Sequence, residues 1–150
     1  MKYSAFVTLL GLLFYSCNFC NRLDCVTDNY HGQFRIVRAT DGADLVFGPT
    51  KIYDKSQIRF YALISSDTTF FDYQTIKFPN TGYDSILHVR FFPKVDVAYM
   101  QLSNGDIDTL NISYHIFDTK CCGMITQISN FRFNNSVDIR GSEGTQEIRK

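Results

Sequence analysis

The stretch that decides the fold class is Ile107–Phe117, which has the sequence IDTLNISYHIF. Its apolar side chains fall on every second residue, at Leu110, Ile112, Tyr114 and Ile116. The residues between them are polar: Thr109, Asn111, Ser113 and His115. Because successive side chains of a strand point to opposite faces of a sheet, this alternation predicts a strand with one buried face.

Similar short runs occur along most of the chain. They are Gln33–Arg38, Ile58–Ile64, Phe70–Phe78, Ser85–Phe92, Val95–Leu102 and Met124–Phe133. The side chains expected to point inward are Phe34 and Ile36 in the first run and Leu87, Val89 and Phe91 in the fourth. Asn104-Gly105 lies between two alternating runs, which predicts an antiparallel hairpin of Val95–Leu102 with Ile107–Phe117.

The amino-acid composition also favours strands over helices. Phe, Tyr, Ile, Val and Thr are abundant, Ala is sparse, and only two of the 15 acidic residues are Glu. Strand formers therefore outweigh helix formers, and no segment shows a helical stripe. Short alternating strands separated by turns predict an all-β, antiparallel β-sandwich of the immunoglobulin-like kind, with a small β-barrel as the alternative. We expect the domain to span residues 31–140, followed by a polar, flexible tail over 141–150.

Residues 1–16 have the pattern of a signal peptide. A single Lys2 precedes an apolar run from Ala5 to Tyr15, and the small residue Ser16 comes directly before Cys17. The run is too short to span a bilayer, which takes about 20 residues as a helix. We therefore expect the leader to direct export and then to be removed.

The Ser16-Cys17 ending resembles the lipobox of bacterial lipoproteins, with Phe14 where that motif usually has Leu. The resemblance implies lipidation of Cys17 by acyl chains such as palmitate, and a tether over residues 17–30. More than one acyl chain anchors a domain stably, because each buried methylene contributes about 0.8 kcal/mol. The expected location is the bacterial cell envelope, membrane-anchored; the alternative is a secreted protein cleaved by ordinary signal peptidase.

Four cysteines remain if Cys17 carries lipid, and an exported chain can form disulfides from them. They are Cys20, Cys25, Cys121 and Cys122. Adjacent cysteines on a strand point to opposite faces, so Cys121 and Cys122 are not expected to bond to each other. Cys25 is the simplest partner for one of them, and the other is either buried or paired with Cys20. The spacing does not match a zinc knuckle or a redox motif.

The sequence predicts no catalytic, cofactor-binding or metal-binding residue. Net charge is zero, which argues against nucleic acid as a partner. The three histidines are scattered, and no GxSxG elbow is present. Asn104, Asp106 and Asp108 are similar to the opening of a calcium loop, but His115 stands where the closing Glu would be. We therefore expect these carboxylates to serve the turn.

Three hydroxyl residues lie in Asp-Ser/Thr tripeptides that resemble the O-glycosylation sequence of Bacteroidota envelope proteins. They are Thr68, Ser85 and Thr109. Chance occurrence in a chain rich in Asp, Ser and Thr is the alternative.

Three segments resemble small uncharacterised lipoproteins of Bacteroidota: Asp41–Gly48, Asp106–Leu110 and Lys120–Gly123. The resemblance implies an envelope location and transfers no functional residue. We expect a non-catalytic interaction or binding module for a protein or glycan partner. Its candidate surfaces are the loop Asp41–Gly48 and the hairpin tip Asn104–Asp106, because binding residues concentrate on loops. The alternatives are an envelope hydrolase or metal-dependent enzyme, and an inhibitor or immunity-type lipoprotein.

Overall fold

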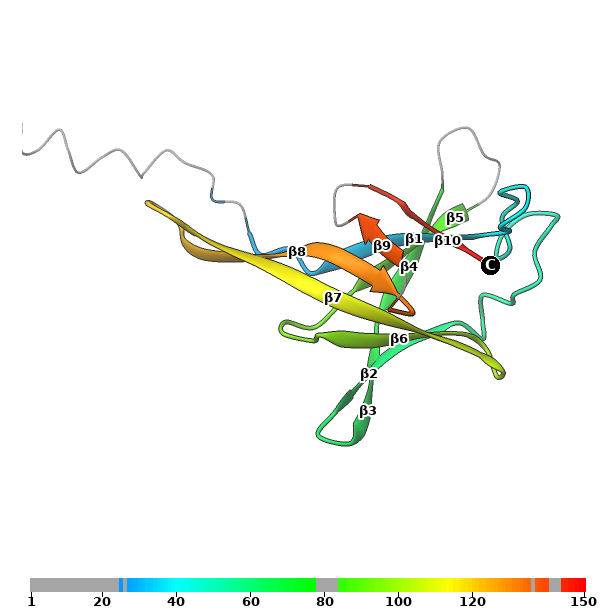
Figure 1. Ribbon diagram of the computed structural model, residues 1–150, viewed down its shortest axis with the longest axis horizontal. Helices are drawn as coiled ribbons and strands as arrows, with labels where there is room; N and C mark the ends of the chain where they lie inside the picture. Colours follow the sequence, from blue (N-terminus) through cyan, green and yellow to red (C-terminus); the bar gives the residue numbers. More distant parts are fainter. Residues whose placement is uncertain (1–24, 26, 78–83, 136, 141–143) are drawn as a thin grey trace, which may run out of the picture. The chain divides into compact units, whose positions relative to one another are not determined.

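The computed structural model describes residues 25, 27–77, 84–135, 137–140 and 144–150. This part of the chain is all-β (Figure 1). Its strands are β1 (His31–Val37), β2 (Arg59–Ile64), β3 (Asp67–Phe71), β4 (Tyr73–Lys77), β5 (Asp84–Arg90), β6 (Val97–Ser103), β7 (Asp106–Thr119), β8 (Gly123–Phe133), β9 (Val137–Arg140) and β10 (Gln146–Arg149). The described residues include no helix long and apolar enough to cross a membrane. The signal peptide, Cys17 and Cys20 lie outside the described residues.

The strands form two sheets, with the orders β10-β1-β5-β4 and β3-β2-β6-β7-β8-β9. Buried side chains from both sheets share one apolar core, so the domain is a β-sandwich and not a closed barrel. With β1 taken as immunoglobulin strand B, the order β1-β5-β4 corresponds to B-E-D, and β3-β2-β6-β7 corresponds to C′-C-F-G. The predicted fold class is confirmed.

The position of immunoglobulin strand A is filled by β10, which pairs with β1 in parallel (Figure 1). Phe34 lies opposite Gln146 and Val37 opposite Arg149, and Ile148 is 1% exposed. The prediction of a flexible tail over 141–150 is therefore wrong from Gln146 onward. Residues 141–143 lie outside the described part. Only two side chains of this strand point inward, which is too short an alternation to recognise in the sequence.

Phe34 lies at the centre of the core. Its ring contacts Phe60 and Phe131 of the opposite sheet and Phe91, which follows β5. Gly32 makes this packing possible, because a Cβ there would come within 2.7 Å of the Phe34 ring and 2.8 Å of the Phe131 ring. The other side chains expected to point inward from β1 and β5 are also buried: Ile36, Leu87, Val89 and Phe91.

The predicted hairpin is confirmed, since β6 and β7 pair antiparallel around the Asn104-Gly105 turn. Leu110 and Ile112 are buried on the expected face of β7. The expected burial of Ile116 is wrong: it is 56% exposed, and it does not belong to the compact unit that contains the core.

The end of β7, the following turn and the start of β8 (residues 116–125) belong to a second compact unit that also contains Cys25. Within this unit Cys25 is disulfide-bonded to Cys122, with 5.6 Å between their Cα atoms. Cys121 is disulfide-bonded as well, and its partner lies outside the described residues. The prediction that Cys25 bonds to one of the adjacent cysteines is confirmed.

Loss of the Cys25–Cys122 bond is expected to lower the free energy of unfolding by about 2–4 kcal/mol. The bond joins residues 97 positions apart, and closing so long a loop removes conformational entropy from the unfolded chain. Urea denaturation of the double variant Cys25→Ser/Cys122→Ser under oxidising conditions measures the loss. Fully reduced wild-type protein serves as the reference and should be at least as destabilised. An unchanged urea midpoint in the double variant would contradict this expectation.

Candidate functional site

The candidate site is built on the long connection between β1 and β2, residues 38–58. Its turn at residues 45–48 is organised by the buried Asp44, whose Oδ1 accepts hydrogen bonds from the backbone N–H groups of Val46 and Phe47, each at 2.9 Å. Thr50 Oγ1 donates to the Asp44 carbonyl at 2.7 Å. An Asp that caps its own following backbone is a local turn signal, so the sequence itself specifies this bend.

The remainder of the connection is pinned to that turn. The Leu45 carbonyl accepts hydrogen bonds from the backbone N–H groups of Ile52 and Tyr53, both at 2.9 Å. Leu45, Val46 and Phe47 are buried in the domain core. A loop with satisfied backbone groups and inserted apolar side chains is a rigid frame for the residues that it exposes.

Two tyrosine hydroxyls attach the frame to the sheets. Tyr53 donates to Asp106 Oδ2 at 2.6 Å, and Tyr73 donates to the Lys55 carbonyl at 2.7 Å. Burial, together with the neighbouring Asp106 carboxylate, raises the pKa of Tyr53 well above its ordinary value. The Tyr53 hydroxyl therefore keeps its proton and remains a donor to Asp106.

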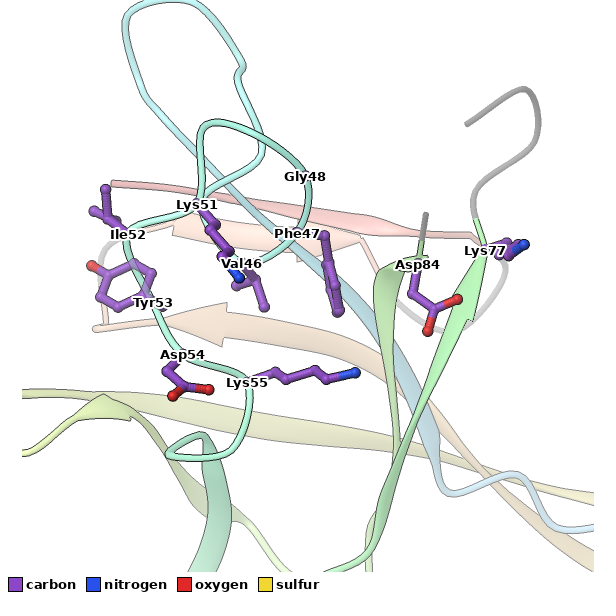
Figure 2. A pocket seen from close by; sticks show the side chains of 10 residues that line it. All are labelled: Val46, Phe47, Gly48, Lys51, Ile52, Tyr53, Asp54, Lys55, Lys77 and Asp84. Atoms are coloured by element: carbon purple, nitrogen blue, oxygen red, sulfur yellow. The ribbon is translucent and has the colours of Figure 1, made fainter. Parts of the chain in front are cut away.

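This frame borders an open pocket of about 590 Å³, which lies between the connection, the end of β4 and the start of β5 (Figure 2). Val46 and Phe47 supply apolar surface, and the side chain of Lys55 extends across the opening toward those strand ends. The lining residues are Val46, Phe47, Gly48, Lys51, Ile52, Tyr53, Asp54, Lys55, Lys77 and Asp84. The pocket thus includes the end of the predicted surface loop Asp41–Gly48.

The pocket holds three exposed lysines, Lys51, Lys55 and Lys77. None of the three forms an ion pair with any residue in the described part of the chain. Sequence reasoning did not single them out, because an isolated lysine in a polar loop has the same appearance as any solvated side chain.

The two pocket carboxylates have local hydrogen-bond donors. Asp54 Oδ1 accepts from the Ser56 backbone N–H at 2.9 Å, and Asp84 Oδ2 accepts from Thr75 Oγ1 at 2.7 Å. The Ser56 N–H is the main cause of a lowered pKa at Asp54, with further contributions from the Ser56 hydroxyl and from Lys51 and Lys55. Each carboxylate is therefore held in place by a neutral hydrogen-bond donor, and Asp54 also interacts electrostatically with Lys51 and Lys55.

Asp106, at the predicted hairpin tip, and Asp108 form a second charged cluster, which the Tyr53 hydrogen bond links to the frame of the pocket. Lys150 Nζ lies 2.6 Å from Asp106 Oδ1 and 2.5 Å from Asp108 Oδ2. Asp108 Oδ1 also accepts from Asn134 Nδ2 at 2.7 Å. The expectation that these carboxylates serve their own turn is wrong, because they bind a lysine that lies 44 residues after Asp106 and 42 residues after Asp108. Lys150 comes close to Asp106 and Asp108 because β10, which directly precedes it, pairs with β1.

Two histidines that the sequence left scattered come together on β1 and β5. His31 Nδ1 lies 3.0 Å from His88 Nε2, and His88 Nδ1 is buried without a hydrogen-bond partner. A proton on that Nδ1 would leave a buried, unpaired N–H, so we assign the His88 proton to Nε2, which donates to His31. Burial, then His88 and Arg90, lower the pKa of His31. The described residues contain no group of three potential ligands around a metal position.

The glycosylation candidates lie on strands. Thr68 is exposed on β3, opposite Leu63 of β2. The Thr109 hydroxyl on β7 lies 3.3 Å from Asn134 Oδ1. The side chain of Ser85 lies outside the described residues. Modification at these three positions stays a prediction.

The fold and the site together define an immunoglobulin-like β-sandwich with a lysine-lined pocket beside one end of a sheet. Comparisons with known protein families, with curated proteins and with solved structures found no match to this chain. Its function is therefore argued from its own site chemistry.

Proposed function

We propose that this protein is a membrane-anchored envelope lipoprotein that acts as a non-catalytic binding module, with the pocket of residues 46–55, Lys77 and Asp84 as its ligand site. The observation that carries the proposal is the pocket itself. Its volume of about 590 Å³ lies within the range of about 300–1,000 Å³ typical of small-molecule sites. The braced connection holds that shape before a ligand arrives, which reduces the entropy lost on binding.

The lining favours binding over catalysis. Among the described lining residues there is no histidine, serine or cysteine. The two carboxylates, Asp54 and Asp84, accept hydrogen bonds from neighbouring groups, and the pKa of Asp54 is lowered, not raised toward neutrality. A general acid or base is expected to have a pKa near the working pH, so this set of side chains suits recognition.

The location in the envelope is supported by the export leader and by the cysteines. Disulfides persist in oxidising compartments outside the cytosol, and both Cys25 and Cys122 are oxidised. The lipid on Cys17 rests on the sequence alone.

Anchoring is tested on the full chain, produced with its own leader in a Bacteroidota host. Wild-type protein is expected in the membrane fraction, with an intact mass that shows removal of residues 1–16 and the addition of acyl chains. Cys17→Ala should lose both the acyl mass and the membrane association, whereas Cys20→Ala, the control, should keep them. Wild-type protein that retains Met1 and stays in the cytosol would overturn the proposal.

Ligand binding is tested by thermal unfolding in the presence of envelope constituents: neutral sugars, sugar phosphates, amino acids, nucleotides and short peptides. At least one compound is expected to raise the melting temperature of the wild-type protein, because a ligand that binds only the folded state stabilises it. Ile52→Trp narrows the pocket at an exposed position and should abolish that rise. If no compound stabilises the wild type, or if Ile52→Trp responds equally, the pocket is not a ligand site.

A further inference from the structure

Three lysines line the pocket from separate parts of the fold. Lys51 and Lys55 belong to the β1–β2 connection, and Lys77 ends β4. The chain as a whole has a net charge of zero, so this local gathering of lysines does not follow from its composition. Against two aspartates, the three lysines leave the described lining with a surplus of one positive charge, which favours an anionic ligand.

The carboxylates of the pocket offset these lysines only in part: Asp54 interacts electrostatically with Lys51 and Lys55, and Asp84 lies opposite Lys77 in the β4–β5 pair. Asp54 and Asp84 are the pocket's carboxylates, and each is already hydrogen-bonded to a neutral neighbour. Within the described part of the chain, the three ammonium groups have no ion-pair partner. A ligand that brings negative charge would satisfy them.

The kind of cation indicates the kind of anion. Arginine is the residue of choice for planar, bidentate recognition of a carboxylate, and no arginine lines the described pocket. Lysine is a compact point charge with three donors, which suits a phosphoryl group with several oxygens and a charge of about −1.5 to −2. A neutral sugar could hydrogen-bond to Asp54 and Asp84, but it would leave the surplus positive charge of the lining without a counter-charge.

The apolar side of the pocket requires more than a bare ion. Val46, Phe47 and Ile52 line it, and its volume of about 590 Å³ far exceeds that of inorganic phosphate. We propose that the ligand of this pocket is a phosphomonoester with a body about the size of a monosaccharide. Its phosphoryl group contacts Lys51 and Lys55, and its body lies against Val46 and Phe47 (Figure 2). This inference rests on the proposed function, because it names the ligand class of the same site.

The test is calorimetric titration of the full mature chain with glucose 1-phosphate, glucose and inorganic phosphate. Glucose 1-phosphate is expected to bind more tightly than inorganic phosphate, and glucose not to bind. Lys51→Met and Lys55→Met should each weaken binding about tenfold, which corresponds to the loss of about 1.4 kcal/mol from one charged contact. Lys94→Met removes an exposed lysine outside this pocket and should leave binding unchanged.

A second arm identifies the source of the phosphoryl group. Phosphatidylcholine vesicles with and without phosphatidic acid present the same phosphomonoester on a membrane. Binding of soluble glucose 1-phosphate alone supports a free metabolite, and recruitment to phosphatidic acid alone supports a lipid headgroup, provided that Lys51→Met abolishes it.

Three results would overturn the inference. The first is equal affinity for glucose and glucose 1-phosphate. The second is that Lys94→Met weakens binding as much as Lys51→Met does. The third is that the protein binds none of these probes. If one of them is found while another compound still stabilises wild-type protein but not Ile52→Trp, the pocket remains a ligand site and only the phosphomonoester is rejected. Unchanged circular dichroism and melting temperature confirm that the lysine variants are folded.

Discussion

Phe34→Ala is expected to lower the free energy of unfolding by about 3–5 kcal/mol, because it deletes a fully buried ring and leaves a cavity that the core cannot fill. The Phe34 ring centroid lies 5.1 Å from that of Phe131 and 6.1 Å from that of Phe60. Both neighbours belong to the opposite sheet, so the ring joins the two layers of the sandwich. Urea denaturation followed by circular dichroism measures the loss.

Phe92→Ala is the matched control. Phe92 also packs against a core ring, that of Phe71 at 5.3 Å, but it is 44% exposed. Its removal should cost less than about 1.5 kcal/mol, because much of its surface is already in contact with water. Equal losses for the two variants would show that Phe34 is not the centre of the core.

The sequence predicted the sandwich well wherever the signal is local. Alternation in Ile107–Phe117 and the Asn104-Gly105 turn were sufficient for the β6–β7 hairpin, because register and facing are set within a few residues. The same holds for Phe34 and Ile36 on β1. In these segments the apolar spacing and the turn chemistry agree, so local preference and tertiary packing favour the same structure.

The prediction failed where distant segments meet. β10 is only four residues long, and it forms a strand because β1, more than 100 positions earlier, offers it an edge. The His31–His88 contact likewise depends on the pairing of β1 with β5. Neither segment carries a pattern that reveals its partner, since pairing between remote strands leaves no trace in local periodicity.

The sequence predicted only the part of the candidate site that depends on local signals. Asp41–Gly48 was recognised as a surface loop, and the capping role of Asp44 follows from its sequence neighbours. Lys77 is brought to the pocket by β4, and Lys51 and Lys55 by the bend that Asp44 organises. The charge of the site is therefore a property of the fold and not of any one segment.

The cluster of Lys150, Asp106 and Asp108 is the second place where a single substitution is expected to change the stability strongly. Burial disfavours the charged form of Lys150, but hydrogen bonds to Asp106 and Asp108 outweigh it and raise the pKa of the ammonium. Burial also opposes ionisation of Asp106, and the bonds from Lys150 and Tyr53 outweigh it, so the pKa of Asp106 is lowered. In the folded protein each charged form therefore stabilises the other.

Lys150→Met is expected to lower the free energy of unfolding by about 3–5 kcal/mol at pH 7, because it leaves the buried Asp108 without its cation, beside a second carboxylate. Arg149→Met is the control: its side chain is 61% exposed and pairs only at the surface, so its loss should be below about 1 kcal/mol. Denaturant titrations of both variants at matched pH give the comparison, and equal losses would contradict a stabilising role for the cluster.

The difference in stability between wild type and Lys150→Met depends on pH in a way that follows from the directions of the Asp106 and Lys150 pKa shifts. A lowered Asp106 pKa contributes stability that is present above the ordinary value of 3.8 and is lost as the pH falls through the lower folded value. A raised Lys150 pKa contributes stability that is present below 10.5 and is lost as the pH rises through the higher folded value. The gap between wild type and Lys150→Met should therefore be constant between about pH 5 and 9 and should shrink in acid, where protonation of the carboxylates removes the penalty of the missing ammonium. A gap that widens below pH 4 would show that the carboxylates do not stabilise the fold through Lys150.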